Sequence, residues 1–109
     1  MDVHTSKTSI PVTTSTSGNN IIVANIPDTW IYIHELIGSF DGTADTLTVK
    51  AGTRVLATFP LLANQGLTEQ DEPGNDGVAR FTCRPGEDFI LDSVGGTPFV
   101  GSCDYSTRT

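Results

Sequence analysis

Short apolar runs with an alternating pattern, separated by glycine, proline, asparagine or aspartate, constrain this chain more than any other feature of its sequence. From Ile21 onward the hydrophobic period is two residues, which is the period of a β-strand and not of a helix. Runs of this kind occupy residues 21–26, 29–40, 46–49, 54–62, 78–83, 88–94 and 98–107. We therefore expect an all-β protein.

Glycine stands where the chain has to reverse between these runs, as in Asp41-Gly42, Pro85-Gly86 and Gly95-Gly96. It tolerates the positive φ angles that tight turns require. A single sheet of so many strands would leave one apolar face in water, so either two packed antiparallel sheets or a closed barrel is expected. The sequence predicts one all-β domain over residues 21–109.

The first 20 residues differ in composition from the rest. Most positions between Thr5 and Ser17 are serine or threonine, and they offer little apolar area to offset the entropy of ordering. We predict that residues 1–20 form an extended arm. Either a disordered tail or an arm that orders on a neighbouring subunit or partner suits this composition.

The charge balance excludes several classes of partner. Six lysines and arginines against 13 aspartates and glutamates give a net charge of −7, which repels nucleic acid and anionic membranes. The amino-terminal residues have neither the basic start nor the apolar stretch of a signal peptide. We expect synthesis in a reducing cytoplasm, with no nucleic acid or membrane partner.

Cys83 and Cys103, the two cysteines, alternate with the aromatic residues Phe81 and Phe99, on what should be the core faces of their strands. They form no C-x-x-C motif, and the two histidines, His4 and His34, are isolated from them. A metal site or a redox pair is therefore not expected. Buried free thiols are favoured, and a disulfide stays the alternative.

No catalytic constellation is visible in the sequence. His34 and Glu35 are neighbours on one strand and should point to opposite faces. The acidic run at 67–77 reads as a solvated loop, with a weak cation site or a contact to a basic partner as alternatives, and residues 41–45 read as a hairpin turn. We expect no enzyme, and no catalytic, cofactor-binding or metal-binding residues.

The strand at 29–40 has apolar residues on both faces. Alternation places Trp30, Tyr32, His34 and Leu36 on one face, and the other face is also mainly apolar. One face can join the core, while aromatic residues on the other suit a subunit interface better than a sheet covered by a loop. Trp30, Tyr32 and His34 are the predicted oligomer interface.

The carboxyl-terminal half resembles that of small virion proteins of tailed bacteriophages. An apolar strand is followed by Gly-x-x-x-Phe, then Gly-Glu, another apolar strand and a closing Val-Gly-x-x-x-Tyr strand. The residues that carry the pattern are Gly77, Phe81, Gly86, Glu87, Phe89, Leu91, Val100, Gly101 and Tyr105, with a weaker similarity from Trp30 to Pro60.

This resemblance implies a capsid decoration (cement) protein. Such a protein would have a jelly-roll-like antiparallel β-sandwich fold. It would form a homotrimer on the outer surface of the virion, bound to the major capsid protein by its amino-terminal arm or lower rim. The arm residues expected to dock are Thr5, Ser6, Lys7, Ile10 and Val12. The alternative from another class is a carbohydrate- or receptor-binding β-sandwich of a phage tail or adhesin, in which Trp30 and Tyr32 would stack on sugars.

Overall fold

A computed structural model describes residues 7–71 and 79–109 of the chain. These residues contain strands and no helix, and hence no helix that could cross a membrane. The strands in the described part are β1 (Thr8–Thr13), β2 (Asn19–Val23), β3 (Trp30–Phe40), β4 (Asp45–Ala51), β5 (Arg54–Leu61), β6 (Leu67–Gln70), β7 (Phe81–Cys83), β8 (Phe89–Ser93) and β9 (Phe99–Arg108).

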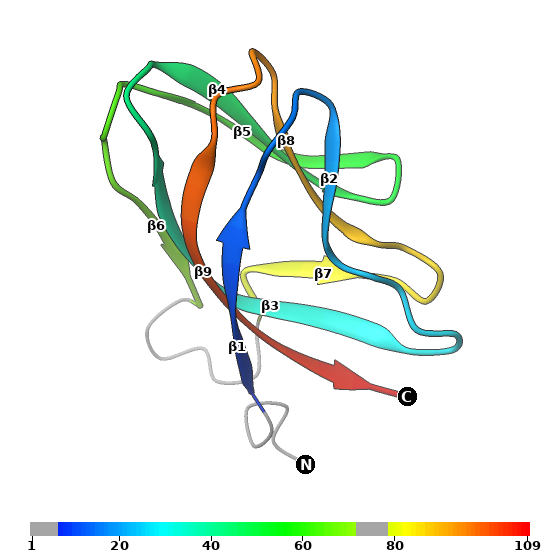
Figure 1. The fold of residues 1–109 in the computed structure, drawn as a ribbon. Coiled ribbons are helices and arrows are strands. Elements are labelled where there is room, and N and C mark those ends of the chain that lie inside the picture. The colour runs from blue at the N-terminus through cyan, green and yellow to red at the C-terminus, as the bar shows by residue number, and fades with distance from the viewer. Residues whose placement is uncertain (1–6, 72–78) are drawn as a thin grey trace.

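The strands form two antiparallel sheets packed face to face (Figure 1). Sheet A has the order β1-β9-β3-β6, and the short strand β7 also pairs with β3, next to β6. Sheet B has the order β2-β8-β4-β5. Apart from β7 and the β4–β5 hairpin within sheet B, successive strands alternate between the two sheets, which is the connectivity of a jelly roll. The predicted fold class is confirmed.

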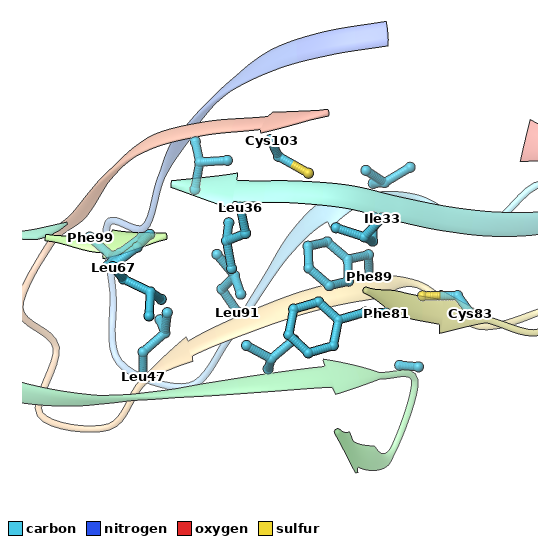
Figure 2. Packing of buried hydrophobic residues seen from close by; sticks show 14 of the residues in the cluster. Ile33, Leu36, Leu47, Leu67, Phe81, Cys83, Phe89, Leu91, Phe99 and Cys103 are labelled. Carbon is cyan, nitrogen blue, oxygen red and sulfur yellow. The ribbon is translucent and has the colours of Figure 1, made fainter. Parts of the chain in front are cut away.

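The core lies between the two sheets, as Figure 2 shows. Two aromatic contacts organise it. Phe40 and Phe99 meet edge to face with ring centroids 5.5 Å apart, and Phe81 stacks on Phe89 at 6.4 Å. Aromatic pairs in these arrangements add to the stabilisation that comes from buried area. The buried members of the core are Val12, Val23, Ile31, Ile33, Leu36, Phe40, Leu47, Val49, Ala51, Leu61, Leu67, Phe81, Cys83, Phe89, Leu91, Phe99 and Cys103.

The backbones of β3 and β9 come closest where Gly38 pairs with Gly101. A Cβ at Gly101 would overlap the carbonyl oxygen of Ile37 and lie 2.6 Å from the Cα atom of Gly38. A Cβ at Gly38 would lie 2.6 Å from the ring of Phe99, which packs over this glycine. Neither position has room for a side chain, so the centre of sheet A requires both glycines.

A β-bulge at His34 interrupts the alternation of β3. The pairing with β9 shifts between Ile33 and Glu35, so that one extra residue stands on β3. Ile31 and Ile33 point into the core before the bulge, and Leu36 points into it afterwards. The prediction that Leu36 shares a face with Trp30 and Tyr32 is therefore wrong.

The predicted boundary at residue 20 is also wrong for the described part of the segment. β1 is the edge strand of sheet A, and its Val12 is buried in the core. Thr14, which follows β1, is buried as well, and its hydroxyl accepts a hydrogen bond from the Phe99 backbone N–H at 2.9 Å. Serine and threonine are compatible with a strand that pairs on one side only, and composition alone did not reveal this.

The start of the acidic run is likewise a strand and not a solvated loop. β6 pairs with β3 between Glu35 and Gly38, and its Leu67 is buried. Residues 72–77 of the run lie outside the described residues.

We predict that Gly101→Ala lowers the free energy of unfolding by at least about 3 kcal/mol, because the new methyl group would overlap the β3 backbone. Gly66→Ala is the matched control, since nothing lies within 4 Å of the Cβ position there. Its effect should stay within about 1 kcal/mol. Urea unfolding of both variants checks this, and similar effects at the two positions would contradict the close approach of β3 and β9.

Candidate functional site: the outer face of sheet A

The face of sheet A that points away from the core carries two rows of side chains without a charge. In the first row Thr13 lies opposite Val100, which lies opposite Ser39. In the second row Ser102 of β9 lies between the outward residues of β1 and β3, namely Pro11 and Ile37.

Val100 is 47% exposed and Ile37 is 36% exposed in these two rows. The residues paired with them are small and uncharged, so the two apolar side chains stand on a surface without charge. An apolar surface without charge suits a contact with another protein. The next row on this face, after Ile37 and Ser102, is charged. In it Glu35 of β3 lies opposite Asp104 of β9, and the Asp104 carboxylate accepts a hydrogen bond from Ser9.

The three predicted interface residues have different environments. Trp30 is exposed at the start of β3 and lies opposite Arg108, and Tyr32 is half-buried. His34 is only 2% exposed, so the prediction that it forms an intersubunit contact is wrong. The bulge brings it into contact with groups of its own chain.

The ring of His34 bonds to two side chains from other strands or loops. Its Nε2 atom lies 2.7 Å from Ser106 Oγ, and its Nδ1 atom lies 2.8 Å from Asp71 Oδ2. Asp71 follows β6, and its other carboxylate oxygen accepts the backbone N–H of Arg80 at 3.1 Å. The network joins β3, β9 and the segment after β6.

The order of atoms in this network is that of a serine, histidine and aspartate catalytic triad. A triad also requires an exposed nucleophile and hydrogen-bond donors for the oxyanion. Ser106 is 3% exposed and stands inside β9, in regular pairing with Tyr32. An acyl substrate therefore has no path to its hydroxyl in this structure, and the contacts suit a buried polar network that fixes three parts of sheet A. No sequence motif reveals this network, because its members are at least 35 residues apart.

The predicted docking residues of the arm lie partly within the sandwich. Thr5 and Ser6 lie outside the described residues. Lys7 is exposed, whereas Ile10 is half-buried against the core and Val12 is buried. Val12 thus packs within its own chain and is not available to a partner, while docking through Lys7 and Ile10 stays a prediction.

Both cysteines are free and buried. Cys83 lies opposite Ile31 and Cys103 opposite Leu36, on the two sides of β3, which places them well beyond the roughly 7 Å between Cα atoms that a disulfide allows (Figure 2). Burial raises the pKa of each thiol to about 12. The prediction of buried free thiols is confirmed.

Several acidic side chains hold loops in place. Burial alone would raise the pKa of Asp45, but hydrogen bonds from the backbone N–H groups of Thr46, Thr97 and Gly95 outweigh it and lower the pKa. Glu87 bonds to Arg54 through both carboxylate oxygens. This contact lowers the pKa of Glu87 to about 2.

Metal binding finds no support in the described part of the chain, where no three histidine, cysteine, aspartate or glutamate side chains gather closely enough to hold an ion.

Comparison with known proteins gives a likeness of fold. No protein-family model matches the chain, and no curated protein matches it by sequence. A solved structure described under the words "Bacillus endospore appendages form a novel family of disulfide-linked pili" superposes with a TM-score of 0.52 at 16% sequence identity. The match covers 95% of this chain and 85% of the other. At this identity the likeness supports the β-sandwich and says nothing further of this chain.

We predict that Ser106→Ala lowers the free energy of unfolding by about 1–2 kcal/mol, because the buried His34 ring loses one hydrogen bond. His34→Ala should cost more, about 2–4 kcal/mol, since it also leaves a cavity. Ser102→Ala, on the exposed side of the same strand, is the control and should change little. Chemical denaturation measures all three, and a neutral Ser106→Ala would contradict a structural role for the network.

We also predict that neither thiol reacts with iodoacetamide in the folded protein at pH 8. At a pKa of about 12, roughly one thiol in ten thousand is ionised at that pH. Mass spectrometry should find no label on the native protein and two labels after unfolding in denaturant. Dithiothreitol should leave the melting temperature unchanged. Rapid native labelling, or a large drop in melting temperature on reduction, would show that the cysteines are exposed or bonded.

Proposed function

We propose that this protein is a structural subunit that decorates and stabilises the outer surface of a phage capsid as a homotrimer, with no enzymatic role. The observation that supports this best is the uncharged outer face of sheet A, where Ile37 and Val100 stand exposed among small side chains. A face of this kind favours contact between copies of the chain, and a jelly roll offers it on a rigid sheet.

A threefold arrangement suits this surface. A contact between different parts of two copies forms a closed ring when the rotation between neighbours is right, and three copies can occupy a threefold position of a shell. The net charge of −7 suits the outside of a container of nucleic acid, where there is no phosphate to bind. The partner in this proposal is the major capsid protein, with the protein made in the host cytoplasm and located on the virion surface.

The solved pilus structure provides a useful contrast. Its description names disulfide-linked pili. Cys83 and Cys103, the two cysteines of this chain, are both buried, so they offer no exposed thiol for a link between subunits. An assembly of this chain would therefore be held by noncovalent contacts.

A second candidate function is the binding of a carbohydrate or receptor, and the exposed Trp30 favours it. Trp30 lies opposite Arg108, which also lines a surface hollow of about 560 Å³. Threonine hydroxyl groups stand at the same hollow. An indole ring beside hydroxyl and guanidinium groups is a combination that stacks on a sugar and bonds to it.

We predict that Ile37→Glu combined with Val100→Glu converts the oligomer to a monomer, because it buries two like charges at each contact. Val55→Glu is the matched control, since Val55 is an exposed apolar residue on the outer face of sheet B. Sedimentation velocity should show a trimer for the wild type and the control, and a monomer for the double variant. A monomeric wild type would contradict the trimer.

The capsid role is tested separately by co-sedimentation with purified shells that lack the protein. Wild-type protein should pellet with the shells, and the monomeric variant should bind far less because it loses the avidity of three joined subunits. A wild type that fails to pellet with shells but binds a glycan array through Trp30 would favour the second candidate function.

A further inference from the structure

One end of the sandwich presents exposed apolar side chains. This loop end consists of the connections at residues 14–18, 41–44, 62–66 and 94–98, at the top and upper left of Figure 1. Leu62 is 71% exposed and Val94 is 57% exposed there. A hollow of about 360 Å³ adjoins them, and its lining residues are Ala44, Asp45, Thr46, Pro60, Leu61 and Leu62.

Hydrogen bonds fix the loops that carry these side chains. Asp45 accepts bonds from the backbone N–H groups of Gly95 and Thr97, at 2.9 and 3.0 Å, which holds the turn after Val94. Gln65 accepts the Leu62 N–H at 2.8 Å, closing its own loop. The apolar side chains are thus held in place before any partner binds, which reduces the entropy cost of binding.

The charge of the loop end restricts what can bind there. Its four connections contain no lysine or arginine, and their one charged residue is Asp41. The adjoining Asp45 adds a second negative charge, so an anionic lipid or nucleic acid would be repelled. The surface suits a partner that is apolar with a positive rim.

The opposite end of the sandwich has these properties. This terminal end consists of the connections at residues 24–29, 52–53 and 84–88 together with the last residues, 107–109, at the right and bottom of Figure 1. Ile26 and Trp30 are exposed there, beside the hollow of about 560 Å³. That hollow is lined by Ile26, Thr29, Thr107, Arg108 and Thr109.

The terminal end also carries exposed positive charge. Arg84 and Arg108 are exposed and form no ion pair within the described residues. Two aspartates lie at the same end: Asp28 is exposed, and Asp88 accepts hydrogen bonds from Asn25, whereas Glu87 forms an ion pair with Arg54. Each end therefore combines exposed apolar residues with a hollow, and of the two only the terminal end carries exposed positive charge.

We propose that copies of this chain associate head to tail, with the loop end of one copy on the terminal end of the next. Leu62 and Val94 would pack against Ile26 and Trp30, and Arg108 would face Asp41. The two ends lie at opposite ends of β3, roughly 30 Å apart, so one copy can use both at once. The contact is separate from the outer face of sheet A and does not depend on the trimer proposed above.

The size of the ends makes this a weak contact. The two shorter extents of the molecule are 29 and 20 Å, so each end can bury at most about 600 Å², at the low end for specific interfaces. Association should therefore depend on protein concentration. A contact between two different surfaces adds copies in a row unless the row closes into a ring.

The test uses two double variants with substitutions at exposed positions. Leu62→Ser with Val94→Ser removes the apolar residues of the loop end, and Ile26→Ser with Arg108→Glu alters the terminal end. Ile21→Ser is the matched control, because Ile21 is equally exposed but lies on the outer face of sheet B. Sedimentation velocity is measured for each protein from micromolar to millimolar concentration, and for an equimolar mixture of the two double variants.

The smallest species that each protein forms, a monomer or a trimer, is its basal unit. For the wild type and the control, the sedimentation coefficient should rise above that of the basal unit as the protein concentration rises. Each double variant alone should need at least about tenfold more protein to reach the same association. In the mixture, one double variant keeps an intact terminal end and the other keeps an intact loop end. These two ends should join, so the mixture should form a species of two basal units and no larger one.

The proposal is overturned if the wild type stays at its basal unit up to millimolar concentration, or if either double variant alone associates like the wild type. A mixture that stays at the basal unit also overturns it, since the contact would then not join the two different ends. The sheet A variants described above decide the trimer independently of all these results.

Discussion

Sheet A depends on the contact between the backbones of β3 and β9. β3 pairs with β9 on one side and with β6 and β7 on the other, so every strand of the sheet except β1 contacts it directly. Where Gly38 meets Gly101, the absence of side chains lets the ring of Phe99 cover the backbone. Phe99 then packs edge to face against Phe40, which links the sheet to the core.

Seven strands and the class of fold were predictable from the sequence because alternation and turn glycines report local structure directly. β1 and β6 were not, and for the same physical reason. Both are edge strands in which one residue, Val12 or Leu67, supplies most of the burial, so neither has the alternating apolar run of a central strand. Their structure comes from pairing with residues far away in the sequence, which no local pattern contains.

The candidate site was predicted in part. The sequence correctly pointed to β3 as a strand with two apolar faces, but strict alternation failed at the bulge. One extra residue at His34 turned Leu36 into the core and gave the histidine ring its bonds to Ser106 and Asp71. A bulge depends on the register with a partner strand, so a single sequence cannot reveal it. The exposed residues Ile37 and Val100 then became the centre of the outer face.

The burial of both thiols has a consequence for the conditions in which the fold can exist. With no disulfide to form or break, the folding equilibrium contains no electron-transfer step. The free energy of unfolding should therefore be the same against a reducing glutathione pool as in air-saturated buffer. Such a chain can move between reducing and oxidising compartments without a change in its covalent structure at these cysteines, and its fold needs neither a thiol oxidase nor a disulfide isomerase.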